Sequence, residues 1–124
     1  MRWLAATGLA VCLMLAHADE RLDAYLLVQV SFVAGFQHYD GKRVFSRLKV
    51  GDSLQLVRES DHQHDRNAIR VEWQGFTLGY VPRNANTDLA RQLDFGNHLR
   101  ARIIRLSRHR DPDRRVEIEI VLPL

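Results

Sequence analysis

Hydrophobic and polar residues alternate along several short stretches of the chain, a pattern typical of strands that bury one face. The clearest example is Leu26–Ala34, where Leu26, Val28, Val30, Phe32 and Ala34 share one side. Turn residues such as Gly, Asp and Pro separate the stretches, which favours antiparallel strands over a strand–helix alternation. Six strands are predicted, at Leu26–Ala34, Ser53–Val57, Ala68–Trp73, Phe76–Pro82, Leu99–Leu106 and Val116–Leu122.

The third and fourth predicted strands form a hairpin around Gln74-Gly75. A two-residue turn sets the register. It pairs Trp73 with Phe76, Val71 with Leu78 and Ile69 with Tyr80. In this register Tyr80 shares a face with Ile69, so a place in the core and a place in a binding site both stay open. The same register carries Tyr80 and Arg83 to the edge of the polar loop before the hairpin, where they are expected to enclose a cavity.

One helix is predicted after Pro82, because the following residues combine a cap with an apolar stripe. Asn84, Asn86 or Thr87 can cap a helix that runs to about Leu93, and Gly96 suits its end. The stretch Arg43–Leu48 fits either a short strand or a single helical turn. The predicted fold class is mainly β, a small and partly closed OB-like barrel of about six strands with one helix.

The first residues have the layout of a secretory signal peptide. Arg2 precedes an apolar run, and Ala16-His17-Ala18 is an A-x-A cleavage site. A lipoprotein signal at Cys12 is less favoured because Val11 is bulky and the apolar run continues beyond it. We therefore expect a signal peptide at 1–18, a domain at 25–123, a periplasmic or secreted location, and no membrane association after cleavage. Cleavage removes the single cysteine, so the domain has no disulfide.

Composition favours a globular domain, and the arginine-rich charge fits either an anionic partner or a solvated surface. Hydrophobic residues make up 46% of the chain, the formal net charge is +3, and 16 of the 18 basic residues are arginine. The planar guanidinium fork suits phosphate or carboxylate. Arginines of the last third could follow a phosphate backbone, but nearby aspartates and glutamates make a salt-bridged surface the alternative. These arginines are Arg100, Arg102, Arg105, Arg108, Arg110, Arg114 and Arg115.

The loop within Arg58–Val71 carries more titratable chemistry than a strand connection requires. Two histidines lie among two aspartates, as Asp61, His62, His64 and Asp65. Zinc or another divalent metal on His62, His64 and Asp65 is one interpretation, although the spacing matches no known metal motif. His64 with Asp65 offers a general base at most, and no Ser or Cys is placed as a nucleophile, so an enzyme is not predicted. Asp65 and Asn67 could instead form an Asx-turn.

Several blocks of the chain, in this order, resemble the HIRAN domain family. The two most specific are Asp65-x-Asn67-Ala68-Ile69-x-Val71 and Leu78-Gly79-Tyr80-Val81-Pro82-Arg83. They are preceded by Val33-Ala34-Gly35-x-x-x-Tyr39-Asp40-Gly41 and by Gly51-Asp52-Ser53-Leu54-x-Leu56-x-Arg58-Glu59, and followed by Asp94-Phe95-Gly96. The resemblance implies a compact OB-like barrel. It also implies an accessory module that, in the family's DNA translocases, captures the 3′ end of single-stranded DNA.

Carried over by position, the resemblance implies roles for individual residues. Asp65 would accept the terminal 3′-hydroxyl, while His64 and His38 stand where aromatic stackers are expected. Gln37 stands at a position that is basic in DNA-binding members, and Arg83 would face a phosphate. The full predicted nucleic-acid-binding set is Gln37, His38, Tyr39, Asp61, His62, His64, Asp65, Asn67, Tyr80 and Arg83. A helicase or nuclease would be the partner; the alternative is an exported protein-interaction or metal-binding module on the same barrel.

Overall fold

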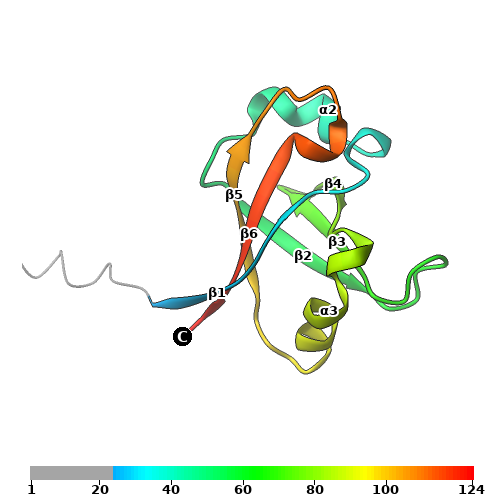
Figure 1. Cartoon of the computed structure of the whole chain (residues 1–124), viewed down its shortest axis with the longest axis vertical. Coiled ribbons are helices and arrows are strands. Elements are labelled where there is room, and N and C mark those ends of the chain that lie inside the picture. Colours follow the sequence, from blue (N-terminus) through cyan, green and yellow to red (C-terminus); the bar gives the residue numbers. More distant parts are fainter. Residues whose placement is uncertain (1–23) are drawn as a thin grey trace, which may run out of the picture.

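The computed structural model describes residues 24–124, so the predicted signal peptide lies outside the described residues. Six antiparallel strands form one sheet in the order β1-β6-β5-β2-β3-β4 (Figure 1). All six predicted strands are present. Their bounds are β1 Tyr25–Phe32, β2 Ser53–Glu59, β3 Ala68–Trp73, β4 Phe76–Tyr80, β5 Arg100–Leu106 and β6 Val116–Pro123.

The sheet is not closed, which corrects the prediction of a partly closed barrel. Strands β1 and β4 are its two edges. An isolated bridge joins Ala34, just after β1, to Tyr80 at the end of β4, with paired backbone N–H···O distances of 2.8 and 2.9 Å. The alternation of residues predicts strands but not whether their edges meet, because closure depends on the twist and stagger of the whole sheet.

Two short α-helices lie among the described residues, where one was predicted. Helix α3, Thr87–Asp94, is the predicted helix and buries Leu89 and Ala90. Helix α2, Gly41–Val44, is followed by the 3-10 turn η2, Phe45–Arg47, which settles the open interpretation of that stretch as helical. Three further 3-10 turns are η1 Phe36–His38, η3 Arg83–Ala85 and η4 Pro112–Arg114. No helix within residues 24–124 is long and apolar enough to cross a membrane.

The β3–β4 hairpin has the predicted turn but not the predicted register. Trp73 pairs with Phe76 around Gln74-Gly75, both at positive φ. A bulge then leaves Leu78 without a partner, so Val71 faces Gly79 and Arg70 faces Tyr80. The predicted pairings of Val71 with Leu78 and of Ile69 with Tyr80 were therefore wrong, since one extra residue on a strand moves all later side chains to the other face. The bulge turns Tyr80 away from the core and toward Arg70.

Gly79 follows the bulge, and its backbone lies very close to the backbone of Ala34. Its φ is +152°, and a Cβ on it would lie 2.2 Å from the carbonyl oxygen of Ala34. A glycine within a strand often marks such a close backbone approach. The Ala34–Tyr80 bridge, and with it the position of Tyr80, depends on that contact.

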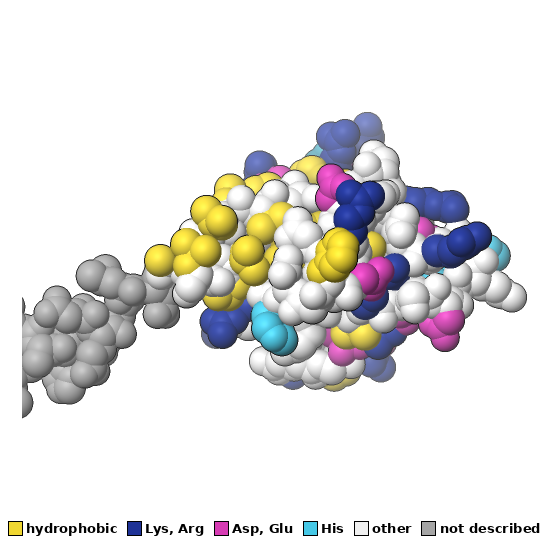
Figure 2. All heavy atoms as spheres, turned by 90° about the horizontal axis from the view of Figure 1, so that it is seen from below, with side chains coloured by type: hydrophobic (Ala, Val, Ile, Leu, Met, Phe, Trp, Pro, Cys, Tyr) yellow, Lys and Arg dark blue, Asp and Glu magenta, His cyan; other side chains and the backbone are white. Residues whose placement is uncertain are grey.

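The first strand departs from its predicted amphipathic pattern. A register shift between Leu27 and Gln29 disrupts its pairing with β6. Leu26 and Val30, predicted on the half-buried face, are 54% and 47% exposed. Figure 2 shows hydrophobic side chains gathered on the surface beside the start of the described chain. The core lies instead under the middle of the sheet, and its largest fully buried side chains include Phe36, Ile69, Leu78, Leu89, Ile103, Ile118 and Ile120.

Candidate functional site

A surface hollow of about 260 Å³ brings together three segments that are distant in the sequence. The segment after β1 contributes His38 and Tyr39, and the β2–β3 loop contributes His62 and Asp65. The end of β4 and the residues after it contribute Tyr80 and Arg83. Backbone or small side chains complete the lining at Ala34, Gly35, Ala68 and Val81. We call this the Tyr80 hollow.

Aromatic rings cluster around Tyr80 in this hollow. The Tyr39 ring lies 5.5 Å from the Tyr80 ring in a tilted arrangement, and the His62 ring lies 5.5 Å from it edge-on. These are distances at which aromatic pairs attract one another. Tyr39 is 43% exposed, so part of this aromatic surface remains open to a flat ligand.

The Tyr80 hydroxyl is held by a charged network on the sheet. It donates to Glu59 Oε1 at 2.6 Å, and Glu59 also pairs with Arg70. Arg70 donates in addition to Glu72 Oε2 at 2.7 Å, and this hydrogen bond is the main cause that raises the pKa of Arg70. The network holds the Tyr80 ring in one orientation through a charge-assisted hydrogen bond.

Burial, followed by the hydrogen bond to Glu59, raises the pKa of Tyr80 from 10.0 to about 12. Folding therefore favours the neutral phenol, and stability is lost as the pH rises from about 10 to about 12. We expect absorbance titration at 295 nm to show one tyrosine ionising near pH 12, and Tyr80→Phe to remove that late phase. The control Tyr39→Phe should retain it. A late phase that survives in Tyr80→Phe would contradict the assignment.

Asp65 has a fixed position because both of its carboxylate oxygens accept hydrogen bonds. Oδ1 accepts from the Asn67 backbone N–H at 2.9 Å, which is the Asx-turn that the sequence left open. Oδ2 accepts from Asn86 Nδ2 at 2.8 Å, and Asn86 is only 1% exposed. Two carboxylate oxygens offer about four acceptor sites, so Asp65, which lines the hollow, keeps the capacity to accept from another donor.

Arg83 supplies a positive charge at the rim. Its Nη2 donates to the backbone carbonyl oxygen of His64 at 2.6 Å, which holds the side chain against the β2–β3 loop. No carboxylate lies within salt-bridge distance of Arg83 in residues 24–124. The guanidinium is therefore positioned without being neutralised.

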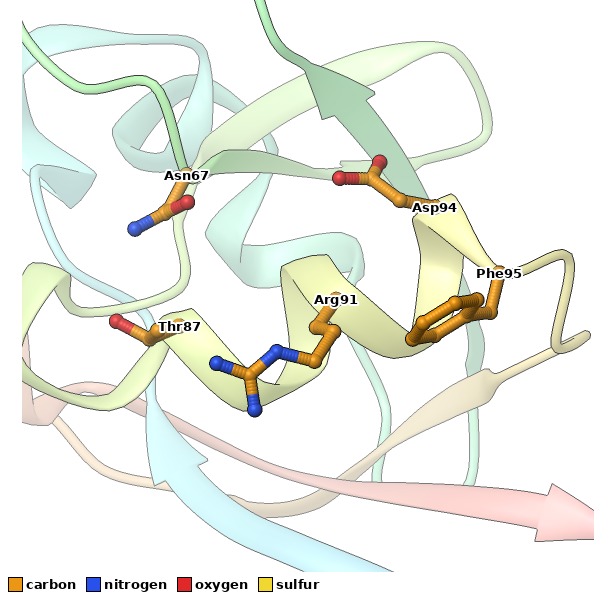
Figure 3. Close-up of a pocket in the computed structure, with 5 residues that line it drawn as sticks. All are labelled: Asn67, Thr87, Arg91, Asp94 and Phe95. Atoms are coloured by element: carbon orange, nitrogen blue, oxygen red, sulfur yellow. The ribbon is translucent and has the colours of Figure 1, made fainter.

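Four predicted site residues do not line the Tyr80 hollow. Asp61 and His64 are exposed on the loop, so His62 rather than His64 presents its ring to the hollow. Gln37 is also exposed and contacts His38 Nε2 at 3.4 Å. Asn67 lines a separate hollow of about 280 Å³ beside α3 (Figure 3). That hollow is completed by Thr87, Arg91, Asp94 and Phe95.

Three residues that support the site were not predicted: Glu59, Arg70 and Asn86. In the sequence Glu59 falls in the polar loop after a predicted strand and Arg70 falls among the polar positions of the next one, and the bulge that brings Tyr80 to them has no sequence signal. Asn86 was predicted as a helix cap, but its side chain caps nothing and is buried against Asp65. A buried polar group requires a partner, and the partner here is the predicted site residue.

The metal-binding alternative has no ligand set in the described part of the chain. No group of three His, Cys, Asp or Glu side chains there could hold a metal ion. His62 Nδ1 instead accepts a hydrogen bond from the His64 backbone N–H at 3.2 Å. This contact uses one of the ring nitrogens that a metal would need.

The HIRAN domain family matches residues 26–124. A crystal structure of a protein from Lactobacillus plantarum is 30% identical, with a TM-score of 0.70, covering 82% of this chain and 98% of that one. The crystal structure of the HIRAN domain of human HLTF is 16% identical with a TM-score of 0.61, covering 79% and 78%, and shares the fold. No curated protein matches. Since the family match covers most of the chain, this protein belongs to the HIRAN domain family.

Proposed function

We propose that this protein is a non-catalytic module that captures the 3′ end of single-stranded DNA in the Tyr80 hollow. The observation that carries the proposal is the meeting of aromatic rings, one carboxylate and one unneutralised guanidinium in a single hollow. A nucleic-acid end offers the matching groups, which are a flat base, a terminal hydroxyl and a phosphate. The HIRAN resemblance implies the same ligand.

The aromatic rings would hold the terminal base. Tyr39 and Tyr80 line the hollow together with His38 and His62. Stacking of a base on an aromatic side chain contributes about 1–3 kcal/mol and depends little on which base it is. Because Glu59 holds the Tyr80 hydroxyl, little side-chain freedom is lost on binding. The module would therefore accept strand ends of any sequence.

Asp65 would select an end over the interior of a strand. Its ionised carboxylate accepts hydrogen bonds and donates none, so it favours a 3′-hydroxyl and repels a phosphate in that place. Arg83, which lines the same hollow, would attract the phosphate that precedes the terminal nucleoside. The carboxylate and the guanidinium would thus bind different groups of the same strand end.

We propose that a helicase or a nuclease is the partner that acts on the captured strand. With the predicted signal peptide, the DNA and that partner would be periplasmic or extracellular. Zinc or another cofactor is not part of the proposal.

The direct test compares two fluorescent oligonucleotides that differ only in a 3′-hydroxyl or a 3′-phosphate. We expect the hydroxyl form to bind about tenfold more tightly, since the phosphate meets the Asp65 carboxylate. Fluorescence anisotropy at fixed ionic strength measures both affinities. Equal affinities would leave general arginine–phosphate attraction as the only mode of binding, and no binding of either oligonucleotide would overturn the proposal.

A further inference from the structure

We propose that Lys42, Arg108 and Arg115 form a second site, which binds a phosphate group. They line a hollow of about 350 Å³ together with Phe45, here called the Lys42 hollow. Its ligand in the complete assembly would be a backbone phosphate of the strand whose end lies in the Tyr80 hollow. That part of the inference rests on the proposed function, whereas the phosphate chemistry of the site does not.

The three positive charges have no acidic partner. Within residues 24–124, salt bridges neutralise Arg43, Arg58, Arg70, Arg91, Arg102 and Arg114, but none involves Lys42, Arg108 or Arg115. The salt-bridged alternative for the arginine-rich C-terminal third therefore holds for part of that region. Arg102 and Arg114 belong to a salt-bridged surface, whereas Arg108 and Arg115 converge on Lys42 with their charge uncompensated.

Two of the three cations are held in place by groups that leave their charge intact. The Arg108 guanidinium lies over the Phe45 ring, 5.4 Å from its centre, which is a cation–π contact. Arg115 Nε donates to the carbonyl oxygen of His109 at 2.8 Å. The backbone bond from Ser107 N–H to the Arg115 carbonyl, at 2.9 Å, closes the base of the loop that carries both. Prepositioned cations lose less side-chain entropy when an anion binds.

The Lys42 hollow and the Tyr80 hollow border the same short segment. Gly35, His38 and Tyr39 line the Tyr80 hollow, and Lys42 of α2 and Phe45 of η2, a few residues later, line the other. The β5–β6 connection passes beside α2 (Figure 1). It is tied to the same segment by the Gly35 N–H, which donates to Asp113 Oδ1 at 2.9 Å. A strand leaving the Tyr80 hollow along this segment would bring its phosphates to the Lys42 hollow.

The test uses Lys42→Gln/Arg108→Gln against a control with the same change in net charge, Lys49→Gln/Arg110→Gln. Both control residues are exposed, and neither lines the Lys42 hollow. We expect the first variant to bind oligonucleotides about tenfold more weakly, with a salt slope smaller by about 1.4, and the control to change affinity by less than about twofold. Preference for the 3′-hydroxyl should be unchanged in both. Equal effects in the two variants would overturn the proposal.

Inorganic phosphate separates this site from the proposed function. In a nuclear magnetic resonance titration, phosphate should shift the signals of Lys42, Arg108 and Arg115, and the Lys42→Gln/Arg108→Gln variant should lose these shifts. Phosphate shifts without oligonucleotide binding would support the site with free phosphate as its ligand, while the proposed function would fall. Oligonucleotide binding with no such shifts, and with no difference between the two variants, would remove the site and leave the proposed function standing.

Discussion

Replacing Asp65 with asparagine is expected to abolish most of the preference for a 3′-hydroxyl over a 3′-phosphate. Asparagine removes the negative charge that repels the phosphate, so the affinity ratio of the two oligonucleotides should fall about tenfold, toward one. The new amide can turn either its N–H₂ group or its carbonyl oxygen toward Asn86 Nδ2. Only the carbonyl oxygen can accept the hydrogen bond from Asn86. Anisotropy measured well below the melting temperature of the variant gives the ratio without interference from unfolding.

A second variant, Asn86→Ala, separates the role of Asp65 in end selectivity from its role in stability. Asn86→Ala removes the buried donor to Asp65 Oδ2 but leaves the carboxylate in the hollow. We expect it to lower the free energy of unfolding by about 1–3 kcal/mol, because a buried hydrogen bond is lost, while the preference for a 3′-hydroxyl persists. If Asp65→Asn and Asn86→Ala lose the preference equally, Asp65 acts by shaping the loop and not by recognising the end.

Gly79→Ala is expected to give the largest loss of stability of the variants considered. The new methyl group would lie 2.2 Å from the Ala34 carbonyl oxygen and 2.8 Å from Val33 Cγ1. The backbone at φ +152° also strains any residue other than glycine. Since the contact with the Ala34 carbonyl oxygen cannot relax without disturbing the Ala34–Tyr80 bridge, we expect the free energy of unfolding to fall by about 3 kcal/mol or more. Urea denaturation followed by tryptophan fluorescence measures this.

Gly75→Ala is the control for the cost of placing alanine at a positive φ without a steric clash. Gly75 also has a positive φ, +83°, but a Cβ there would meet nothing within 4 Å. Its replacement should therefore lower the free energy of unfolding by only about 1 kcal/mol. Similar losses at the two glycines would mean that the contact with Ala34 contributes little.

The parts of the fold that were predictable are those set by local pattern. Alternation identified the six strands, and Gln74-Gly75 identified the hairpin turn, because period and turn chemistry act over a few residues. The bulge at Leu78 was not predictable, since a single unpaired residue leaves the alternation almost unchanged while reversing the side on which Tyr80 emerges. Tyr80 reaches its place beside Glu59 and Arg70 only through that bulge.

The candidate site shows the same division between local and long-range effects. His38, Tyr39, His62, Asp65, Tyr80 and Arg83 were predicted and line one hollow. His64 and Asn67 lie in the same loop as His62 and Asp65 but point elsewhere, because loop geometry, here the Asx-turn at Asp65, decides which neighbours face inward. Whether a C-terminal arginine forms a salt bridge depends on which strands lie side by side. The alternation of residues along one strand does not encode this.

The first and last strands pair with each other, and the Leu124 N–H donates to the Ala24 carbonyl oxygen at 3.0 Å. Two short linkers would therefore be enough to place this whole domain within a surface loop of a host enzyme, since the two junctions would lie side by side. The Tyr80 hollow is built from internal segments and would keep its shape after such a transplant. An inserted copy would carry the Tyr80 hollow, and with it the proposed capture of strand ends, into its host.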